Sequence, residues 1–348
     1  MKQKLSDRLH VLVMAGGSGT RFWPKSRKQK PKQLLKLWDD KSLIEHTLDR
    51  FADNPVWIVT TEKLVEATKD VVGDKYLNVR YLAEPSACNT AACILWGTRE
   101  IQKQDPNAMI AVMPADHYIG DLPTFQKALE TAVQFASENP SLVTLGIRPT
   151  KPETGYGYIE CEGAFNELSP VFVKQFVEKP DLRTAVRYVE SAKFLWNAGM
   201  FIFSASTGMK AFQNCMPELF DLFEKEKDIQ KVYASIREED RVSVDYGVME
   251  TAMSKGISVA IVPVSCKWND VGSFPALEEI DRPMLGDVVS LDAPCNIVQT
   301  DTGLVALLGV NDLVVVRDKD VVLVTSKDRA QDIKLLLEKV KAKSPERL

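Results

Sequence analysis

The sequence predicts an α/β fold: a mixed, mainly parallel sheet flanked by helices, followed by a small all-β domain and a closing helix. Short runs rich in β-branched residues alternate with helical patterns over most of the chain, which is typical of a parallel sheet covered on both faces. After Asp281-Arg282-Pro283 the apolar runs become closely spaced. The length of 348 residues also exceeds that of one ordinary compact domain. We therefore expect a large domain over residues 1–282 and a small one over residues 283–348.

The elements of the large domain follow from this alternation. Helical spacing of apolar residues predicts helices at Asn89–Gln104 and Pro123–Glu138, with Asn89 as a candidate N-cap. The predicted strands are apolar runs bounded by turn residues: Val11–Met14, Val56–Thr60, Val79–Leu82, Met109–Met113, Leu142–Ile147, Val171–Val177, Met200–Phe203 and Ser258–Val264.

The small domain is predicted to be β-rich. Its apolar runs are separated by Asp, Asn and Gly turns, and lie at 296–300, 303–309, 313–316 and 321–325. In the last predicted helix, Asp328–Ala342, an apolar stripe is formed by Ile333, Leu336, Leu337 and Val340. We expect this stripe to dock on one of the two domains.

The composition excludes several classes of protein. Forty-four basic residues against forty-eight acidic ones give a net charge of −4, so no general positive field is present to bind a nucleic-acid polymer. The six cysteines are scattered without C-x-x-C spacing, which indicates free thiols in a reducing compartment. The run Val11–Ala15 is too short for a signal peptide, and no run is long enough to span a membrane. We expect a cytoplasmic protein without a membrane partner.

A Gly-rich turn after the first strand is the most informative segment. Gly16, Gly17 and Gly19 allow backbone N–H groups to turn toward an anion. Neither the dinucleotide loop nor the Walker loop has this pattern. Six basic side chains follow without a single acid: Arg21, Lys25, Arg27, Lys28, Lys30 and Lys32. This charge suits a triphosphate, although solvated lysines on a mobile surface loop are the simpler alternative.

The segment resembles the signature of sugar nucleotidylyltransferases, G-G-x-G-T-R followed by P-K-Q, with Pro31-Lys32-Gln33 in the second position. Further segments resemble this family in the same order: Glu84-Pro85 with Asn89-Thr90, Pro114-Ala115-Asp116-His117, Thr154–Ile159, Phe176–Pro180, Trp196–Phe201, Ser243–Tyr246 and Trp268–Ser273. The P-A-D-H and W-N-D-V-G-S versions resemble the branch that uses GTP and mannose 1-phosphate. Two departures stand out, because Ala87-Cys88 replaces a common Gly-Arg and Leu34 a common Phe.

The resemblance implies a Rossmann-like (GT-A-type) sheet with a left-handed β-helix-like appendage, which could form a homodimer. It also implies that the phosphate of the sugar attacks the α-phosphorus of a nucleoside triphosphate and displaces pyrophosphate. The nucleophile is already an anionic oxygen, so alignment and charge neutralisation should carry the reaction without a general base. His117 is then expected to have at most a supporting role.

Carried over residue by residue, the resemblance assigns a role to each matching position. The nucleotide would be bound by Ala15, Gly16, Gly17, Gly19, Thr20, Arg21, Glu84, Asn89, Thr90 and Asp116. The sugar phosphate would be bound by Gly157, Glu178, Lys179 and Asn197. The residues expected to carry the reaction are Arg21, Lys32, Asp116, Lys179 and Asp270. Tyr156 and Tyr158 are expected to pack rather than to act.

Mg²⁺ is the cofactor that this assignment implies. Asp116 follows the strand Met109–Met113 at its carboxyl end, where open α/β sheets place ligands. Asp270 is its proposed partner, since Mg²⁺ typically takes one or two carboxylates together with phosphate oxygens and water. A helix cap for Asp116 and a turn residue for Asp270 are the simpler alternatives.

Three other functions were compared with this one. A dinucleotide-dependent oxidoreductase would need a helix directly after the glycines, and the basic, Pro-containing run from Arg21 to Lys32 excludes it. A catalytically silent regulatory homologue is disfavoured by the intact Arg21, Lys32, Asp116, Lys179 and Asp270. A nucleotidylyltransferase for another hexose or another base remains open.

Overall fold

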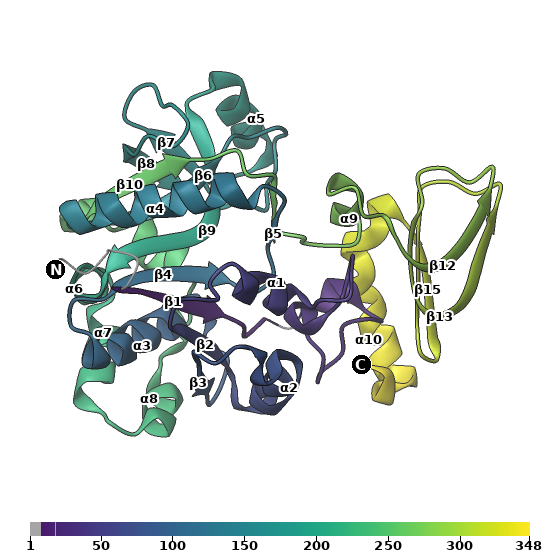
Figure 1. Cartoon of the computed structure of the whole chain (residues 1–348), viewed down its shortest axis with the longest axis horizontal. Helices are drawn as coiled ribbons and strands as arrows, with labels where there is room; N and C mark the ends of the chain where they lie inside the picture. Colours follow the sequence, from purple (N-terminus) through teal and green to yellow (C-terminus); the bar gives the residue numbers. More distant parts are fainter. Residues whose placement is uncertain (1–7, 18) are drawn as a thin grey trace.

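The computed structural model describes residues 8–17 and 19–348, and Ser18 of the predicted Gly-rich turn lies outside the described residues. Within that part of the chain, nine strands form one sheet in the order β3-β2-β1-β4-β9-β6-β10-β8-β7 (Figure 1). These strands are β1 (Leu9–Met14), β2 (Val56–Thr61), β3 (Val79–Glu84), β4 (Met109–Pro114), β6 (Ser141–Ile147), β7 (Tyr158–Cys161), β8 (Val171–Val177), β9 (Phe194–Ser204) and β10 (Ser258–Pro263).

The sheet is mixed and mainly parallel, as the sequence predicts. Strands β3, β2, β1 and β4 are parallel neighbours, and β6 and β10 form a second parallel pair. Strand β9 lies between these two sets and is antiparallel to both β4 and β6. Strands β8 and β7 complete the edge in antiparallel pairing. The chain thus brings the carboxyl ends of β1 and β4 together at one edge of the sheet.

Strand β9 is longer than the predicted run Met200–Phe203, because it begins at Phe194. Asn197 and Gly199 interrupt the apolar pattern that predicts a strand, and Gly199 has a φ of 66°. The strand continues through them since the Asn197 amide is buried and hydrogen-bonded to Thr144 of β6. Strand β7 has no counterpart among the predicted runs.

Helices cover both faces of the sheet. Alternate residues of β1 point to opposite faces: Leu12 belongs to one buried cluster, and Val11 and Val13 to another. The first cluster includes α3 (Asn89–Gln104), α6 (Ala205–Cys215), α7 (Pro217–Lys225) and α8 (Ile229–Ser235). The second includes α1 (Leu43–Asp49), α2 (Glu62–Val72) and α4 (Leu122–Glu138). Helix α5 (Leu182–Ser191) packs on β7 and β9 through a smaller cluster.

The predicted N-cap of α3 is wrong by one position. Cys88 is the N-cap, and Asn89 is the first helical residue. Asn89 has a φ of 65°, and its Oδ1 accepts a hydrogen bond from the backbone N–H of Thr90. The predicted helix Pro123–Glu138 is confirmed as α4, whose N-cap is Asp121.

The C-terminal part is a β-helix-like domain. It contains β12 (Met284–Leu291), β13 (Ile297–Leu308), β14 (Leu313–Asp318) and β15 (Val321–Ser326). Strands β12, β13 and β14 pair in parallel although only a few residues separate them. Since a parallel pair within one flat sheet needs a crossover of about a dozen residues or more, the chain here winds in coils. The predicted runs 296–300 and 303–309 form one strand, bent where β12 and β13 shift register.

Helix α10 (Ile333–Lys343) connects this domain to the larger one and lies between the main body and the strands β12 to β15 (Figure 1). Its Ile333 is buried in a cluster, here called the junction core, that also holds Phe22 and Trp23 after the Gly-rich turn and Val314 and Val316 of β14. Of the predicted stripe, Leu337 and Val340 also pack against the junction core.

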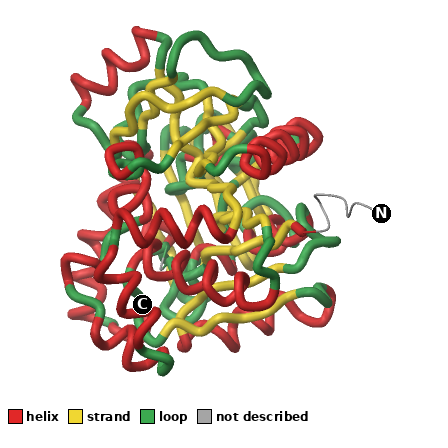
Figure 2. Tube along the Cα trace, turned by 90° about the vertical axis from the view of Figure 1, so that its left-hand side faces the viewer, coloured by secondary structure: helices red, strands yellow, loops and turns green. Residues whose placement is uncertain are grey.

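Leu336 of the predicted stripe is 38% exposed, so its place there is wrong. The contact with the body is narrow, and the spacing of Ile333, Leu337 and Val340 is enough to fill it. Two short strands, β5 (Tyr118–Ile119) and β11 (Trp268–Asn269), pair with each other, and α9 (Ala276–Glu279) is a short helix. Figure 2 shows helices on the outside of the strands of the main sheet. In residues 8–17 and 19–348, none of the helices has the length and apolar character that a membrane crossing requires.

Candidate active site

The Gly-rich turn begins where β1 ends. Gly19 has φ 60° and ψ 33°, a left-handed conformation, and a Cβ there would lie 2.8 Å from the backbone nitrogen of Lys32. Only glycine allows the turn to lie this close to the Lys32 backbone. Gln33 then donates a 2.5 Å hydrogen bond from Nε2 to the carbonyl oxygen of Ala15. The turn is therefore fixed at both its strand end and its far end.

The basic side chains after the turn fall into two groups: some contact the C-terminal domain and others line a cavity. Lys25 is buried and donates from Nζ to Oε1 of Gln299 at 3.2 Å. The Arg27 guanidinium lies 3.5 Å from carboxylate oxygens of Asp318 and Asp320. Assigning the whole run to a triphosphate is therefore wrong for Lys25 and Arg27, because their polar groups bind the C-terminal domain.

The other cations of the turn border a cavity of about 290 Å³, here called the phosphate pocket. Its lining consists of Gly19, Thr20, Arg21, Phe22, Lys32, Asp116, His117, Asp270, Gly272 and Lys334. The Lys32 ammonium lies 2.7 Å from Oδ2 of Asp116 and donates a 2.7 Å hydrogen bond to the backbone oxygen of Asp270. Burial opposes ionisation of Asp116, but the charge and hydrogen bond of the Lys32 ammonium hold its pKa below the usual range.

Arg21 lines this pocket and has a buried donor that is not satisfied. Its Nε is buried without a hydrogen-bond partner among residues 8–17 and 19–348. An unpaired buried donor costs about 1–3 kcal/mol, more when it is charged. Arg21 therefore has hydrogen-bonding capacity that other residues of the described chain do not use.

Asp270 is held in place by hydrogen bonds from Tyr156 and Gly272. Its Oδ1 accepts a 2.7 Å hydrogen bond from the Tyr156 hydroxyl and a 3.2 Å bond from the Gly272 N–H. The expectation that Tyr156 only packs is therefore incomplete: its ring packs against Trp196 and Trp268, while its hydroxyl orients Asp270. Tyr158 is fully buried, as expected for packing.

The two aspartates fit a divalent cation that is shared with a ligand. Both line the phosphate pocket, and carboxylate oxygens are the donors that Mg²⁺ prefers. Across the described ranges 8–17 and 19–348, no group of three His, Cys, Asp or Glu side chains is placed to hold a metal. An ion bound by Asp116 and Asp270 would therefore need phosphate oxygens to complete its coordination.

His117 is held in the neutral state beside these groups. Burial lowers its pKa to about 4, and the indole Nε1 of Trp268 donates to its Nδ1 at 3.1 Å. A neutral, hydrogen-bonded imidazole agrees with the supporting role expected from the sequence.

A second cavity of about 300 Å³, here called the nucleoside pocket, adjoins the first and shares Asp116 with it. Its lining is Met14, Ala15, Gly16, Gly17, Gln33, Glu84, Ala87, Cys88, Asn89, Thr90, Cys93, Pro114, Ala115 and Asp116. The predicted nucleotide-binding residues thus lie on two connected cavities: Gly19, Thr20 and Arg21 on the phosphate pocket, and the remainder on the nucleoside pocket.

Glu84 is the buried acid of the nucleoside pocket. Only 4% of it is exposed, and burial raises its pKa to about 7 despite the 2.9 Å hydrogen bond that the Tyr233 hydroxyl donates to Oε1. A carboxyl that lines a cavity and has a pKa near neutral pH is suited to accepting hydrogen bonds from a ligand.

The predicted sugar residues form a separate group: Gly157 just before β7, Glu178 and Lys179 just after β8, and Asn197 within β9. A Cβ at Gly157 would lie 2.5 Å from Oε2 of Glu178, so glycine is needed for the Glu178 carboxylate to approach the strand. Lys179 forms an ion pair with Glu178 and has a positive φ of 47°. Partial burial tends to lower the pKa of Lys179, but the hydrogen bond and charge of Glu178 and the charge of Asp245 raise this pKa above its usual value. The positive φ of Lys179 is a strained backbone conformation for a non-glycine residue, and such conformations are common at functional sites.

Asn197 is already bound within the protein. Its Oδ1 accepts from the Thr144 hydroxyl at 2.9 Å and from the Gly199 N–H at 3.2 Å, and its Nδ2 donates to Asp245 at 2.8 Å. Only one N–H of the amide is left for a sugar hydroxyl. Asp245 was missed as a candidate, although the segment Ser243–Tyr246 matches a family motif and could have indicated it.

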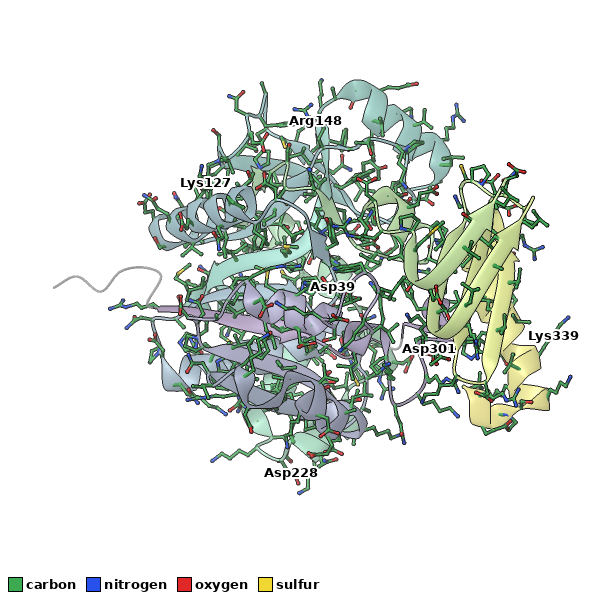
Figure 3. All side chains as sticks on the ribbon, turned by 45° about the vertical axis from the view of Figure 1, so that its right-hand side comes forward. Asp39, Lys127, Arg148, Asp228, Asp301 and Lys339 are labelled. Carbon is green, nitrogen blue, oxygen red and sulfur yellow. The ribbon has the colours of Figure 1, made fainter. Side chains whose placement is uncertain are left out.

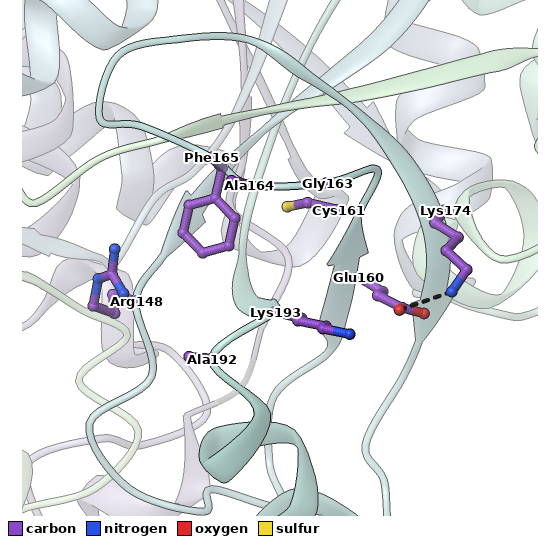
Figure 4. A pocket seen from close by; sticks show the side chains of 9 residues that line it. All are labelled: Arg148, Glu160, Cys161, Gly163, Ala164, Phe165, Lys174, Ala192 and Lys193. Atoms are coloured by element: carbon purple, nitrogen blue, oxygen red, sulfur yellow. Dashed lines mark hydrogen bonds and ion pairs between the residues drawn. The ribbon is translucent and has the colours of Figure 1, made fainter.

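A third cavity, of about 520 Å³, holds none of the predicted site residues (Figure 4). There Lys174 pairs with Glu160 at 2.9 Å, and the Arg148 guanidinium lies 5.3 Å from the centre of the Phe165 ring. These charges are satisfied locally and do not suggest catalysis.

Two family models match successive stretches of the chain. The family model described as nucleotidyl transferase matches residues 10–285, which is most of the chain. The chain belongs to the nucleotidyl transferase family. The model for the MannoseP isomerase/GMP-like β-helix domain matches residues 286–340 of this nucleotidyltransferase.

Curated relatives agree with this membership. The nucleotidyltransferase is 35% identical over 362 residues to a mannose-1-phosphate guanylyltransferase of Escherichia coli K12, covering 97% of this chain and 74% of the relative. It is 37% identical over 360 residues to a protein of the same name from Salmonella montevideo, covering 95% and 73%. The resemblance to sugar nucleotidylyltransferases seen in the sequence is thereby confirmed, and the protein is a nucleotidyltransferase enzyme.

Solved structures support the fold. A Thermus thermophilus structure titled mannose-1-phosphate geranyltransferase superposes on the nucleotidyltransferase with a TM-score of 0.85 at 35% identity, covering 96% of this chain and 99% of the other. A Helicobacter pylori structure titled mannose-6-phosphate isomerase has a TM-score of 0.62 at 26% identity, covering 75% and 99%.

Proposed function

We propose that this nucleotidyltransferase is a mannose-1-phosphate guanylyltransferase, which converts GTP and α-D-mannose 1-phosphate to GDP-mannose and diphosphate. The observation that carries the reaction type is the phosphate pocket, where the unpaired Arg21 and the ion-paired Lys32 face two carboxylates. The relatives named mannose-1-phosphate guanylyltransferase support the choice of substrates.

The proposed reaction is a displacement at phosphorus. A phosphate oxygen of mannose 1-phosphate forms a bond to the α-phosphorus of GTP, the bond to the β-phosphate oxygen breaks, and pyrophosphate leaves with that electron pair. No proton must be removed from the nucleophile. The chain's own residues therefore align two anions and offset their repulsion, which is about 4 kcal/mol for two unit charges 4 Å apart at an effective dielectric of 20.

Each part of the site has a role in this proposal. Backbone N–H groups of the Gly-rich turn and the Arg21 guanidinium bind the triphosphate. Lys32 contacts both the Asp116 carboxylate and the Asp270 backbone oxygen, and so fixes the positions of the two aspartates relative to each other. Asp116 and Asp270 would hold Mg²⁺, which when bound offsets phosphate charge.

On the other side, Lys179 binds the phosphate of the sugar. Glu178 and the free N–H of Asn197 select hydroxyls on its ring.

The base preference is assigned to Glu84. Guanine presents two adjacent donors, its ring N1–H and its 2-amino group, whereas adenine presents an acceptor at N1. An ionised carboxylate only accepts, so Glu84 in the nucleoside pocket favours guanine.

The direct test is a matrix of GTP, ATP, UTP, CTP and dTTP against mannose, glucose and other hexose 1-phosphates, with pyrophosphate release as the readout. GTP with mannose 1-phosphate should give the highest kcat/KM. A preference for another pair would replace the substrates and keep the reaction, while no release with any pair would remove the proposal.

We also propose that residues 1–282 carry the sugar and nucleoside sites and that residues 283–348 support them. The junction core favours this division, because it joins Phe22 and Trp23 beside the phosphate pocket to the β-helix-like domain. A homodimer remains part of the proposal, and light scattering would test it.

A further inference from the structure

Helix α10 is fixed against the Gly-rich turn from the far end of the chain. Ile333 is 3% exposed and packs in the junction core with Phe22. The indole of Trp23 donates a 2.8 Å hydrogen bond to the backbone oxygen of Arg347, just beyond the helix. Gln331, just before the helix, donates to the Ser273 hydroxyl at 3.3 Å. The first turn of α10 is therefore held at the rim of the phosphate pocket.

Lys334 is the residue of this first turn that lines the phosphate pocket, beside Arg21, Lys32, Asp116 and Asp270. It follows the buried Ile333 directly, so the helix cannot turn it away without removing Ile333 from the junction core. None of the hydrogen bonds and ion pairs between residues of the described ranges (8–17 and 19–348) engages its ammonium group. No local pattern in the sequence indicates this role, since Lys334 lies outside every matched motif.

The position of Lys334 is electrostatically unfavourable without a ligand. A cation in the first turn of a helix faces the positive end of the helix dipole, and Arg21 on the same pocket is also positive. An anion placed between these groups would offset both unfavourable interactions of the Lys334 ammonium, the one with the helix dipole and the one with Arg21. The exposed ammonium, the helix end and the unpaired Arg21 therefore point to the same kind of ligand.

The phosphate pocket carries two further cations, Arg21 and Lys334, in addition to Lys32. Lys32 is offset by Asp116, with which it forms an ion pair at 2.7 Å. Asp270 is the second carboxylate of the lining, so Arg21 and Lys334 together leave the pocket net positive. The sugar residues Gly157, Glu178, Lys179 and Asn197 do not line this cavity, so Lys334 lies on the nucleotide side of the site.

We infer that Lys334 binds the terminal phosphates of the nucleoside triphosphate and the pyrophosphate that leaves, so that the C-terminal helix completes the active site. This inference rests on the proposed function. Attack from the sugar side expels the leaving group to the opposite side in an in-line displacement, and Lys334 neutralises charge there. The C-terminal domain then supplies a ligand-binding residue in addition to structural support.

The experiment measures binding of inorganic pyrophosphate by calorimetry, in excess magnesium, to the full chain and to Lys334→Ala, Lys334→Arg and Lys339→Ala. Lys339 is the matched control, because it lies on the same helix and points outward from the body (Figure 3). Loss of one charge-assisted contact should weaken pyrophosphate binding about tenfold in Lys334→Ala. Lys334→Arg should retain most of the affinity, and Lys339→Ala all of it.

Kinetics give a second readout. In Lys334→Ala the KM for GTP should rise about tenfold, while the KM for mannose 1-phosphate should change less than about twofold. Binding of GMP, which lacks the terminal phosphates, should be unchanged. Unchanged pyrophosphate affinity in Lys334→Ala, or equal losses for pyrophosphate and GMP, would overturn the inference.

The two proposals fail in different ways. If no nucleotide and sugar phosphate pair reacts, the proposed function is lost, yet tenfold weaker pyrophosphate binding in Lys334→Ala would still support the phosphate contact. If the full chain turns over GTP and Lys334→Ala binds pyrophosphate normally, the proposed function stands and the role of Lys334 is lost.

Discussion

The nucleotide side and the sugar side of the site are built in different ways. The nucleotide side lies at the carboxyl ends of parallel strands β1 and β4, and its Arg21 has a buried donor without a partner among the described residues. The proposed sugar side lies at the ends of antiparallel strands β7 and β8 and beside β9, where Glu178 is paired with Lys179 and Asn197 with Asp245. In the proposed function, the first side would attract its ligand by uncompensated charge. The second would select its ligand through the few hydrogen-bonding positions that its own pairs leave open.

The largest expected effect is at the boundary between the two sides. Asp116→Asn and Asp270→Asn should each lower kcat by about 100-fold or more, with little loss of fold, and the double variant should be scarcely worse than either single one. A magnesium titration of kcat would measure this, with partial rescue expected. Asp287→Asn, on an exposed position of β12, is the control. Fully multiplicative losses would show that the two aspartates do not act together.

Replacing each of the two proposed phosphate-binding cations by alanine would test whether the nucleotide side and the sugar side are separate. Lys179→Ala should raise the KM for mannose 1-phosphate about 10- to 100-fold and leave nucleotide binding nearly unchanged. Arg21→Ala should do the reverse. Steady-state kinetics with each substrate varied would measure both, with Lys210→Ala, an exposed lysine of α6, as the control. Equal effects of both changes on both substrates would show that the sides are not separate.

Glu84→Gln should weaken the preference for GTP over ATP by about tenfold, because the amide no longer accepts from both guanine donors. Burial raises the pKa of Glu84 to about 7, and only the ionised form binds guanine. In the parent, kcat/KM for GTP should therefore rise as pH increases through 7, and in Glu84→Gln this rise should disappear. The same pH profile in both proteins would remove Glu84 from base recognition.

Stability should show the opposite pH trend. A carboxyl whose pKa is raised from 4.5 to about 7 by folding stabilises the fold when protonated, and that stability is lost as pH rises from 4.5 through 7. Relative to Glu84→Gln, the parent should lose up to about 3 kcal/mol of unfolding free energy over this interval. Denaturant titrations at several pH values would measure it, and a constant difference would contradict the assignment.

The smallest expected effect comes from the junction core, which we expect to support the nucleotide side alone. Ile333→Val should cost about 1 kcal/mol of unfolding free energy, and the KM for GTP should rise about two- to threefold through displacement of the first turn of α10. The KM for mannose 1-phosphate should not change. Leu335→Ala, 67% exposed on the same helix, is the control. A change in both KM values would mean that the junction core supports the whole site.

Much of the fold was predictable because its signals are local. Apolar runs such as Val11–Met14 and Met109–Met113 predict buried parallel strands, and both are confirmed as parts of β1 and β4. The Gly-rich turn and Asp116 were each predicted to follow a strand, and the direct pairing of β1 with β4 brings them to the same edge of the sheet. Strand β9 was only partly predicted, because Asn197 is buried by a partner 53 residues away, which no local pattern reveals.

The sequence by itself determined the order of elements, the position of the Gly-rich turn and the family, since periodicity, turn chemistry and motif order are properties of neighbouring residues. It could not determine which basic side chains face a ligand. Lys25 binds Gln299, 274 positions away, while Lys334 reaches the phosphate pocket from the last helix. Only the packing of the junction core decides these assignments, because a side chain's charge is offset or left open by groups that the folded chain brings to it, wherever they stand in the sequence.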